Sequence, residues 1–150
     1  MTDATPSARL RAAREQRGLT PQQIAAAVGL PVEWYHDLES YPEEMFSNVS
    51  LAHLQALCMT VNIKPQALLL GDDKVPATAE VDFSTLVEEL RTALNSSKLS
   101  VEAFSNKVGW ELKDLLVDPQ ELRNFNVDGL KDVCAAANVN WLAVLSGLQW

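Results

Sequence analysis

Cysteine, histidine and glycine are scarce in this chain of 150 residues, with 2, 2 and 6 copies. Cys58 and Cys134 fall on expected core faces of helices, so we expect buried reduced thiols rather than a disulfide. The spacing of His36 and His53 matches no zinc site, and we expect no metal. So few glycines provide no phosphate-binding loop, and the chain has no nucleophile elbow. The sequence therefore predicts a protein that is not an enzyme and has no cofactor.

Basic residues are also few, because 12 Lys and Arg stand against 20 Asp and Glu, a net charge of −8. Residues 1–74 hold 6 basic and 9 acidic residues, and residues 75–150 hold 6 and 11, so neither half is basic. Since duplex DNA is bound largely through Lys and Arg at its phosphates, this balance disfavours a broad DNA-binding surface. A local cluster of Lys and Arg on one face of the protein is still compatible with this charge balance.

Long apolar runs are missing as well. No stretch approaches the roughly 20 apolar residues that cross a bilayer. The first residues, MTDATPS, lack the charged and apolar segments of a signal peptide. We therefore expect a cytoplasmic protein that makes no contact with a membrane.

Helix signals are plentiful between Leu19 and Glu39. Thr20, Pro21 and Gln23 form the pattern of a capping box at a helix start. Gly29 can adopt the left-handed conformation that ends this helix, and Pro31 can open a second one. A helix, a glycine-containing turn and a second helix make up the helix-turn-helix plan.

The chain resembles the phage-repressor-like (Cro/cI, XRE) helix-turn-helix family over about its first half. The matching residues are LRAAREQRGLT at 10–20, Ile24-Ala25, Val28-Gly29-Leu30, Leu38-Glu39, LAHLQALC at 51–58, VNIKP at 61–65 and Leu68-Leu69. The resemblance implies an all-α, lambda-repressor-like bundle of five helices and a DNA-binding function. It also implies structural roles for Arg14 and Glu39, which often pair in this family, and for Gly29.

The second half repeats the first. An offset of 80 residues pairs Leu10 with Leu90, Thr20 with Ser100 and Gly29 with Gly109, and an offset of 76 pairs Cys58 with Cys134 and Asn62 with Asn138. We interpret this as a tandem duplication whose second copy is degenerate. The expected domains are a first copy at 8–71, a linker at 72–80 and a second copy at 81–150. We expect a loop at Ser40–Val49 of the first copy.

Two functions remain open. In the first, the protein is a transcriptional regulator that binds duplex DNA through the second helix of the motif. The expected backbone contacts are Arg9, Arg11 and Arg17, and the residues expected nearest the bases are Gln22, Trp34 and His36. Thr20 is a further candidate for DNA contact. Carboxylates at Glu33 and Asp37 of the same helix would face a polyanion, which disfavours this function.

In the second, the repressor-like scaffold has lost DNA binding and serves as a protein-interaction module. Trp34, Met45 and Phe46 would then form an apolar contact surface for a protein partner or a second copy of the chain. Alternatively, the acidic surface would mimic DNA towards a basic partner. A further alternative is that Trp34 packs against its own loop or against the second copy and buries Met45 or Phe46.

Overall fold

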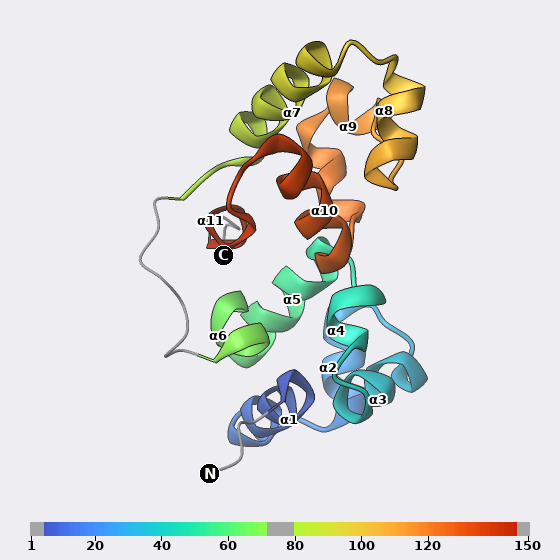
Figure 1. Ribbon diagram of the computed structural model, residues 1–150. Coiled ribbons are helices and arrows are strands. Elements are labelled where there is room, and N and C mark those ends of the chain that lie inside the picture. The colour runs from blue at the N-terminus through green and yellow to red at the C-terminus, as the bar shows by residue number, and fades with distance from the viewer. Residues whose placement is uncertain (1–4, 72–79, 147–150) are drawn as a thin grey trace. The chain divides into compact units, whose positions relative to one another are not determined.

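The computed structural model describes residues 5–71 and 80–146, and these residues are helical with no β-strand among them (Figure 1). The all-α fold class predicted from the sequence is therefore confirmed. The described residues divide into two compact units, one over 5–71 and one over 80–146. Most of the expected linker, residues 72–79, lies outside the described part of the chain.

The first unit contains six helices (Figure 1). They are α1 Pro6–Gln16, α2 Pro21–Val28, α3 Val32–Ser40, α4 Glu44–Ser47, α5 Leu51–Val61 and α6 Pro65–Leu70. Helix α2 packs on α3 and α5, and α1 packs on α3 and α6. The core between them is formed by side chains that are fully buried, among them Leu10, Ile24, Tyr35, Leu51, Leu54 and Leu68.

Two details of the first unit differ from the sequence prediction. Helix α1 begins at Pro6, two residues before the expected start of the first copy at residue 8, because the Thr5 hydroxyl accepts a hydrogen bond from the Ala8 amide and caps the helix there. The segment expected to be a loop contains the short helix α4. Met45 of α4 is fully buried, so burial of its apolar side chain stabilises this single turn.

The second unit follows a similar order. Its elements are α7 Phe83–Ser97, α8 Val101–Val108, α9 Lys113–Val117, the 3-10 helix η2 Pro119–Asn124, α10 Val127–Ala137 and α11 Trp141–Ser146. Helix α7 packs on α10 and η2, and α10 also packs on α8 and α11. Fully buried core side chains include Leu86, Leu90, Leu112, Leu122, Leu130 and Val144.

Several helices of the two units have bounds that correspond residue by residue. Adding 80 to the bounds of α2 gives those of α8, and adding 76 to the bounds of α5 and α6 gives those of α10 and α11. The conformations at their ends correspond too, because Gly29 and Gly109 have φ of 83° and 93°, and Asn62 and Asn138 have φ of 57° and 56°. The correspondence is weaker in the middle, where α9 is shorter than α3 and a 3-10 helix follows it.

Candidate nucleic-acid interface

A capping box opens the first helix of the motif. The Gln23 amide donates to the Thr20 hydroxyl at 3.1 Å, and the Thr20 amide donates to Gln23 Oε1 at 2.9 Å. Pro21 occupies the first helical position, where its missing amide proton costs nothing. The hydroxyl of Thr20, a candidate for DNA contact, is therefore already used to satisfy the helix start, while Gln22 remains exposed.

The left-handed conformation of Gly29 ends α2 and turns the chain towards α3. The amides of Gly29 and Leu30 both donate to the Ala25 carbonyl, at 2.9 and 3.0 Å, which satisfies backbone groups at the end of α2. Pro31 then precedes α3, whose Tyr35 and Leu38 are buried in the core. Helix α2, this turn and α3 form the helix-turn-helix that the sequence predicts.

The solvent face of α3 carries both carboxylates expected there. Glu33, Trp34, His36 and Asp37 are exposed, while Tyr35 and Leu38 point into the core. The exposed fraction of Trp34 is 56%, which is large for tryptophan. In a DNA complex of the usual helix-turn-helix geometry, this face would meet the major groove. It offers hydrogen-bonding groups from His36 but no Lys or Arg.

Glu39, at the buried side of α3, holds three neighbouring side chains. Its carboxylate accepts from Arg14 Nε at 2.6 Å, from Arg14 Nη2 at 3.2 Å and from Arg11 Nε at 3.2 Å. The Tyr35 hydroxyl donates to the same carboxylate. Only 5% of the Glu39 side chain and 12% of the Arg14 side chain are exposed. The ion pair between Arg14 and Glu39 therefore ties α1 to α3 inside the fold.

The environment of Glu39 shifts the pKa values of this cluster. Burial raises the pKa of the Glu39 carboxyl, but hydrogen bonds from Arg14, Tyr35 and Arg11 outweigh burial, and the net pKa is lowered. Burial, together with the hydrogen bond to Glu39, raises the pKa of the Tyr35 hydroxyl. The hydrogen bond to Glu39 raises the pKa of Arg14 despite its burial. At neutral pH the cluster therefore contains a charged carboxylate and a neutral phenol.

Arg9, one of the predicted backbone contacts, is used inside the unit. Its Nε donates to the Leu68 carbonyl at 2.7 Å and its Nη2 donates to the Leu69 carbonyl at 2.8 Å. These carbonyls lie in the last turn of α6, where a cation is favourable because it satisfies groups without a helical partner. The guanidinium of Arg9 therefore points at α6, and a DNA contact at Arg9 stays a prediction that requires these hydrogen bonds to break.

Arg11 and Arg17 remain accessible. The side chain of Arg11 is 56% exposed although it pairs with Glu39, and Arg17 is exposed close to the end of α1. Arg11 and Arg17 are therefore the two predicted backbone contacts of this segment whose side chains are exposed to solvent.

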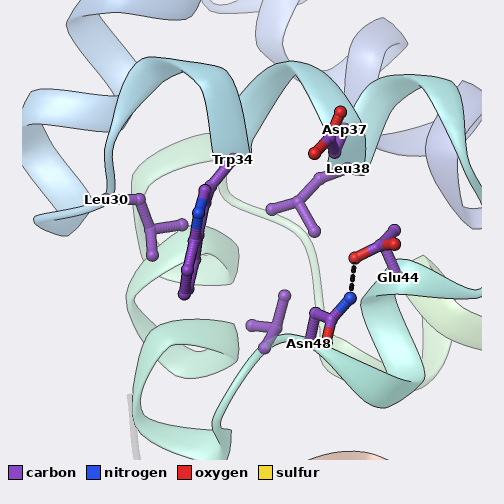
Figure 2. A pocket seen from close by; sticks show the side chains of 7 residues that line it. Leu30, Trp34, Asp37, Leu38, Glu44 and Asn48 are labelled. Carbon is purple, nitrogen blue, oxygen red and sulfur yellow. Dashed lines mark hydrogen bonds between the residues drawn. The ribbon is translucent and has the colours of Figure 1, made fainter.

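A pocket lies beside α3, between its Trp34 face and α4 (Figure 2). Its apolar lining comes from Leu30, Leu38, Val49 and the indole of Trp34. Its polar lining comes from Asp37, Glu44 and Asn48, and the Asn48 amide donates to the Glu44 carboxylate. We call this hollow the Trp34 pocket. Sequence reasoning identified Trp34 but missed the other lining residues, because they come together only when α3 and α4 fold.

Of the two other predicted contact residues, Met45 is fully buried and Phe46 is half-buried. The prediction that Met45 belongs to an exposed contact surface is wrong, because α4 turns this side chain into the core. Met45 therefore does not form an exposed apolar surface together with Trp34. The neighbours of Trp34 in the Trp34 pocket are apolar Leu30, Leu38 and Val49 together with polar Asp37, Glu44 and Asn48.

The turn after α8 in the second unit has the same backbone conformation as the turn after α2, but its surface side chains differ. Ser100 caps α8 by accepting from the Ala103 amide at 3.1 Å, and Gly109 ends it. Trp110 then packs with Phe125 at a centroid distance of 5.5 Å, and its Nε1 donates to Asp132 at 2.9 Å. The tryptophan of this turn is thus held by its own unit.

The fold and the turn geometry together define a helix-turn-helix domain in the first unit. In agreement, the family model of the helix-turn-helix domain matches residues 7–40, which run from the first turn of α1 to the end of α3. No curated protein and no solved structure matches the chain. Among the described residues, none of the helices is long and apolar enough to span a bilayer, and no cluster of ligand side chains suited to a metal is present.

Proposed function

We propose that this protein is a transcriptional regulator of the phage-repressor-like (XRE) helix-turn-helix type that binds duplex DNA and is not an enzyme. The observation that carries the proposal is the helix-turn-helix itself, in which a capped α2, a left-handed Gly29 and α3 follow one another within the matched segment. Proteins of this plan insert the second helix into the major groove. The fold therefore supports DNA as the partner more directly than any single side chain does.

In this proposal Arg11 and Arg17 contact phosphates, and Gln22, Trp34 and His36 lie nearest the bases. All five are exposed, whereas Arg9 is occupied by the carbonyls of α6 and the Thr20 hydroxyl by its own helix. With two arginines instead of three, the electrostatic part of the affinity is small. Contacts from Gln22 and His36, and the shape of α3, must then supply the specificity.

The test is selection of bound sequences from a pool of random duplexes at low salt, followed by a salt titration. Two phosphate contacts give a slope of log affinity against log salt of about −2. We expect Arg17→Ala and Arg11→Ala to reduce this slope by about 1 each. Lys64→Ala is the matched control, because Lys64 is an exposed cation of the same unit at the start of α6, outside the motif.

The outcome that contradicts the proposal is the absence of any retained duplex at low salt while the protein remains folded. A slope that is the same in Arg17→Ala and in the control would also contradict it, because the phosphate contacts would then lie elsewhere.

A second candidate function is a protein-interaction module, and the solvent face of α3 favours it. Glu33 and Asp37 repel phosphate there, and the exposed indole of Trp34 is a typical interface anchor. This candidate predicts a self-association or a complex that Trp34→Ala disrupts without unfolding the protein. Tyr41→Ala is the matched control, since Tyr41 is 53% exposed and does not line the Trp34 pocket.

We further infer that the two units arose by tandem duplication. The residue-by-residue agreement of α2 with α8, α5 with α10 and α6 with α11 supports this inference. The equivalent burial of Cys58 and Cys134, each 1% exposed, supports it as well. In the second unit, Trp110 is held by Asp132 and Phe125, so only the first unit offers an exposed tryptophan on the motif.

A further inference from the structure

The Trp34 pocket combines three chemical features within the first unit. Its floor is apolar, because Leu30, Leu38 and Val49 are 8%, 2% and 1% exposed. One wall is the face of the Trp34 indole, which stands upright beside Leu30 (Figure 2). The rim carries the carboxylates of Asp37 and Glu44. An occupant must therefore satisfy an apolar surface, an aromatic face and a negative rim together.

The rim has no positive partner of its own. No Lys or Arg belongs to the lining among the residues that the structure describes, and Glu44 receives only the neutral amide of Asn48. Asp37 is exposed on α3, one turn from Glu33, so the local potential is negative. An anionic occupant such as a phosphate group is disfavoured by both carboxylates.

A cation on an apolar stem matches all three features. The guanidinium of arginine stacks on indole faces and pairs with carboxylates, and its methylene groups cover apolar surface. Lysine shares the charge and the stem but not the planar fork. The net charge of −8 also favours encounter with a basic partner.

We propose that the Trp34 pocket binds an arginine side chain from a basic segment of a partner protein. The guanidinium stacks on Trp34 between Asp37 and Glu44, and its stem lies on Leu38 and Val49. This inference rests on the second candidate function and names the chemistry of its partner. It does not depend on Arg11 or Arg17, on which the DNA-binding proposal depends.

The experiment uses the full chain, labelled with ¹⁵N, and three capped peptides that differ at one position. Each peptide is an alanine sequence with one leucine beside the variable position, which is arginine, lysine or citrulline. Citrulline has the shape of arginine without its charge. The indole resonance of Trp34 is assigned by its loss in Trp34→Phe and followed during titration. We expect the arginine peptide to shift it, with an affinity about tenfold higher than that of the citrulline peptide, the lysine peptide lying between.

Single substitutions in the protein then test which carboxylates bind the guanidinium of the peptide. Asp37→Asn and Glu44→Gln are each expected to weaken the arginine peptide by about threefold to tenfold, since each removes one carboxylate partner. Glu33→Gln is the matched control, because it removes an exposed carboxylate of α3 outside the lining. We expect it to weaken binding by less than twofold. The spectra of all variants confirm that the fold is kept.

Three outcomes overturn the proposal. The first is that no peptide shifts the Trp34 resonance. The second is that citrulline and arginine peptides bind equally, because the pocket would then select apolar shape alone. The third is a shift of the Trp34 resonance on simple dilution, which would assign the pocket to a second copy of the chain. None of these outcomes alters the salt slope expected for DNA, so the two proposals fail separately.

Discussion

At the scale of single residues, Glu39 connects α1 to α3 through charged hydrogen bonds. Arg14 is almost buried and pairs with Glu39, so removing the carboxylate would leave a buried cation without its partner. Such a loss costs more than the pair itself contributes, because the desolvation of Arg14 is then uncompensated. The same carboxylate orients Tyr35 and reaches Arg11.

We therefore expect Glu39→Gln to lower the free energy of unfolding by about 2–4 kcal/mol at pH 7. Because the pKa of Glu39 is lowered in the folded state, its contribution is fully present above the unfolded pKa and is lost as the pH falls through the folded pKa. The difference between wild type and Glu39→Gln should therefore shrink below about pH 4.5, measured by urea unfolding. Glu15→Gln, an exposed change on α1, serves as the control and should leave stability unchanged.

Residue chemistry also separates the arginines of α1 by their roles. Arg9 satisfies carbonyls of Leu68 and Leu69, which lie 59 and 60 residues further along the chain, whereas Arg17 is exposed near the end of the helix. No pattern in the sequence distinguishes these arginines, since each is a cation on an amphipathic helix. The distinction depends on the packing of α6 against α1, which brings the carbonyls of Leu68 and Leu69 to Arg9.

At the scale of elements, side-chain caps stabilise equivalent helix starts in the two units. Thr20 and Ser100 each accept an amide hydrogen bond three residues ahead, both at 3.1 Å. The hydroxyl at this position satisfies an amide that the helix cannot satisfy itself.

We expect Thr20→Ala and Ser100→Ala each to destabilise the unit that contains it by about 1 kcal/mol. Near-equal losses of stability would agree with equivalent roles of the two caps in the two units. Ser96→Ala is the control, because Ser96 is an exposed residue inside α7 and its removal should change stability by less than about 0.5 kcal/mol. A loss at Thr20 without a loss at Ser100, measured by urea unfolding, would contradict equivalent capping.

At the scale of the whole molecule, each unit contains one buried thiol. Cys58 lies in the first unit and Cys134 in the second, and burial raises the pKa of each to about 12. A thiol with so high a pKa has little reactive thiolate near neutral pH, and its burial excludes reagents. Labelling of each cysteine therefore reports opening of the unit around it.

We expect both thiols to resist iodoacetamide in the native protein and to react after unfolding. Glu39→Gln should raise the labelling rate of Cys58 by about tenfold or more, because a loss of 2 kcal/mol raises the open population by that order. The rate at Cys134 should not change, and peptide mass mapping distinguishes the two sites. An equal rise at both cysteines would show that the two units open together.

The sequence by itself determined the two helices of the motif and the turn between them, because caps, prolines and left-handed glycines act within a few residues of each other. It predicted the turn at Gly29, and the family resemblance predicted the pair of Arg14 with Glu39. It also predicted the exposed face of α3, where Glu33, Trp34 and Asp37 are exposed. These features depend on local spacing, which an amino-acid sequence states directly.

Only the tertiary structure decided which side chains remain free. It directed Arg9 to α6, buried Met45 beneath α4 and placed Glu44 and Val49 beside Trp34. Each of these outcomes depends on contacts between elements that are separated along the chain, where packing of the core competes with exposure to solvent. Local spacing carries no information on that competition, so the Trp34 pocket becomes visible only in the folded unit.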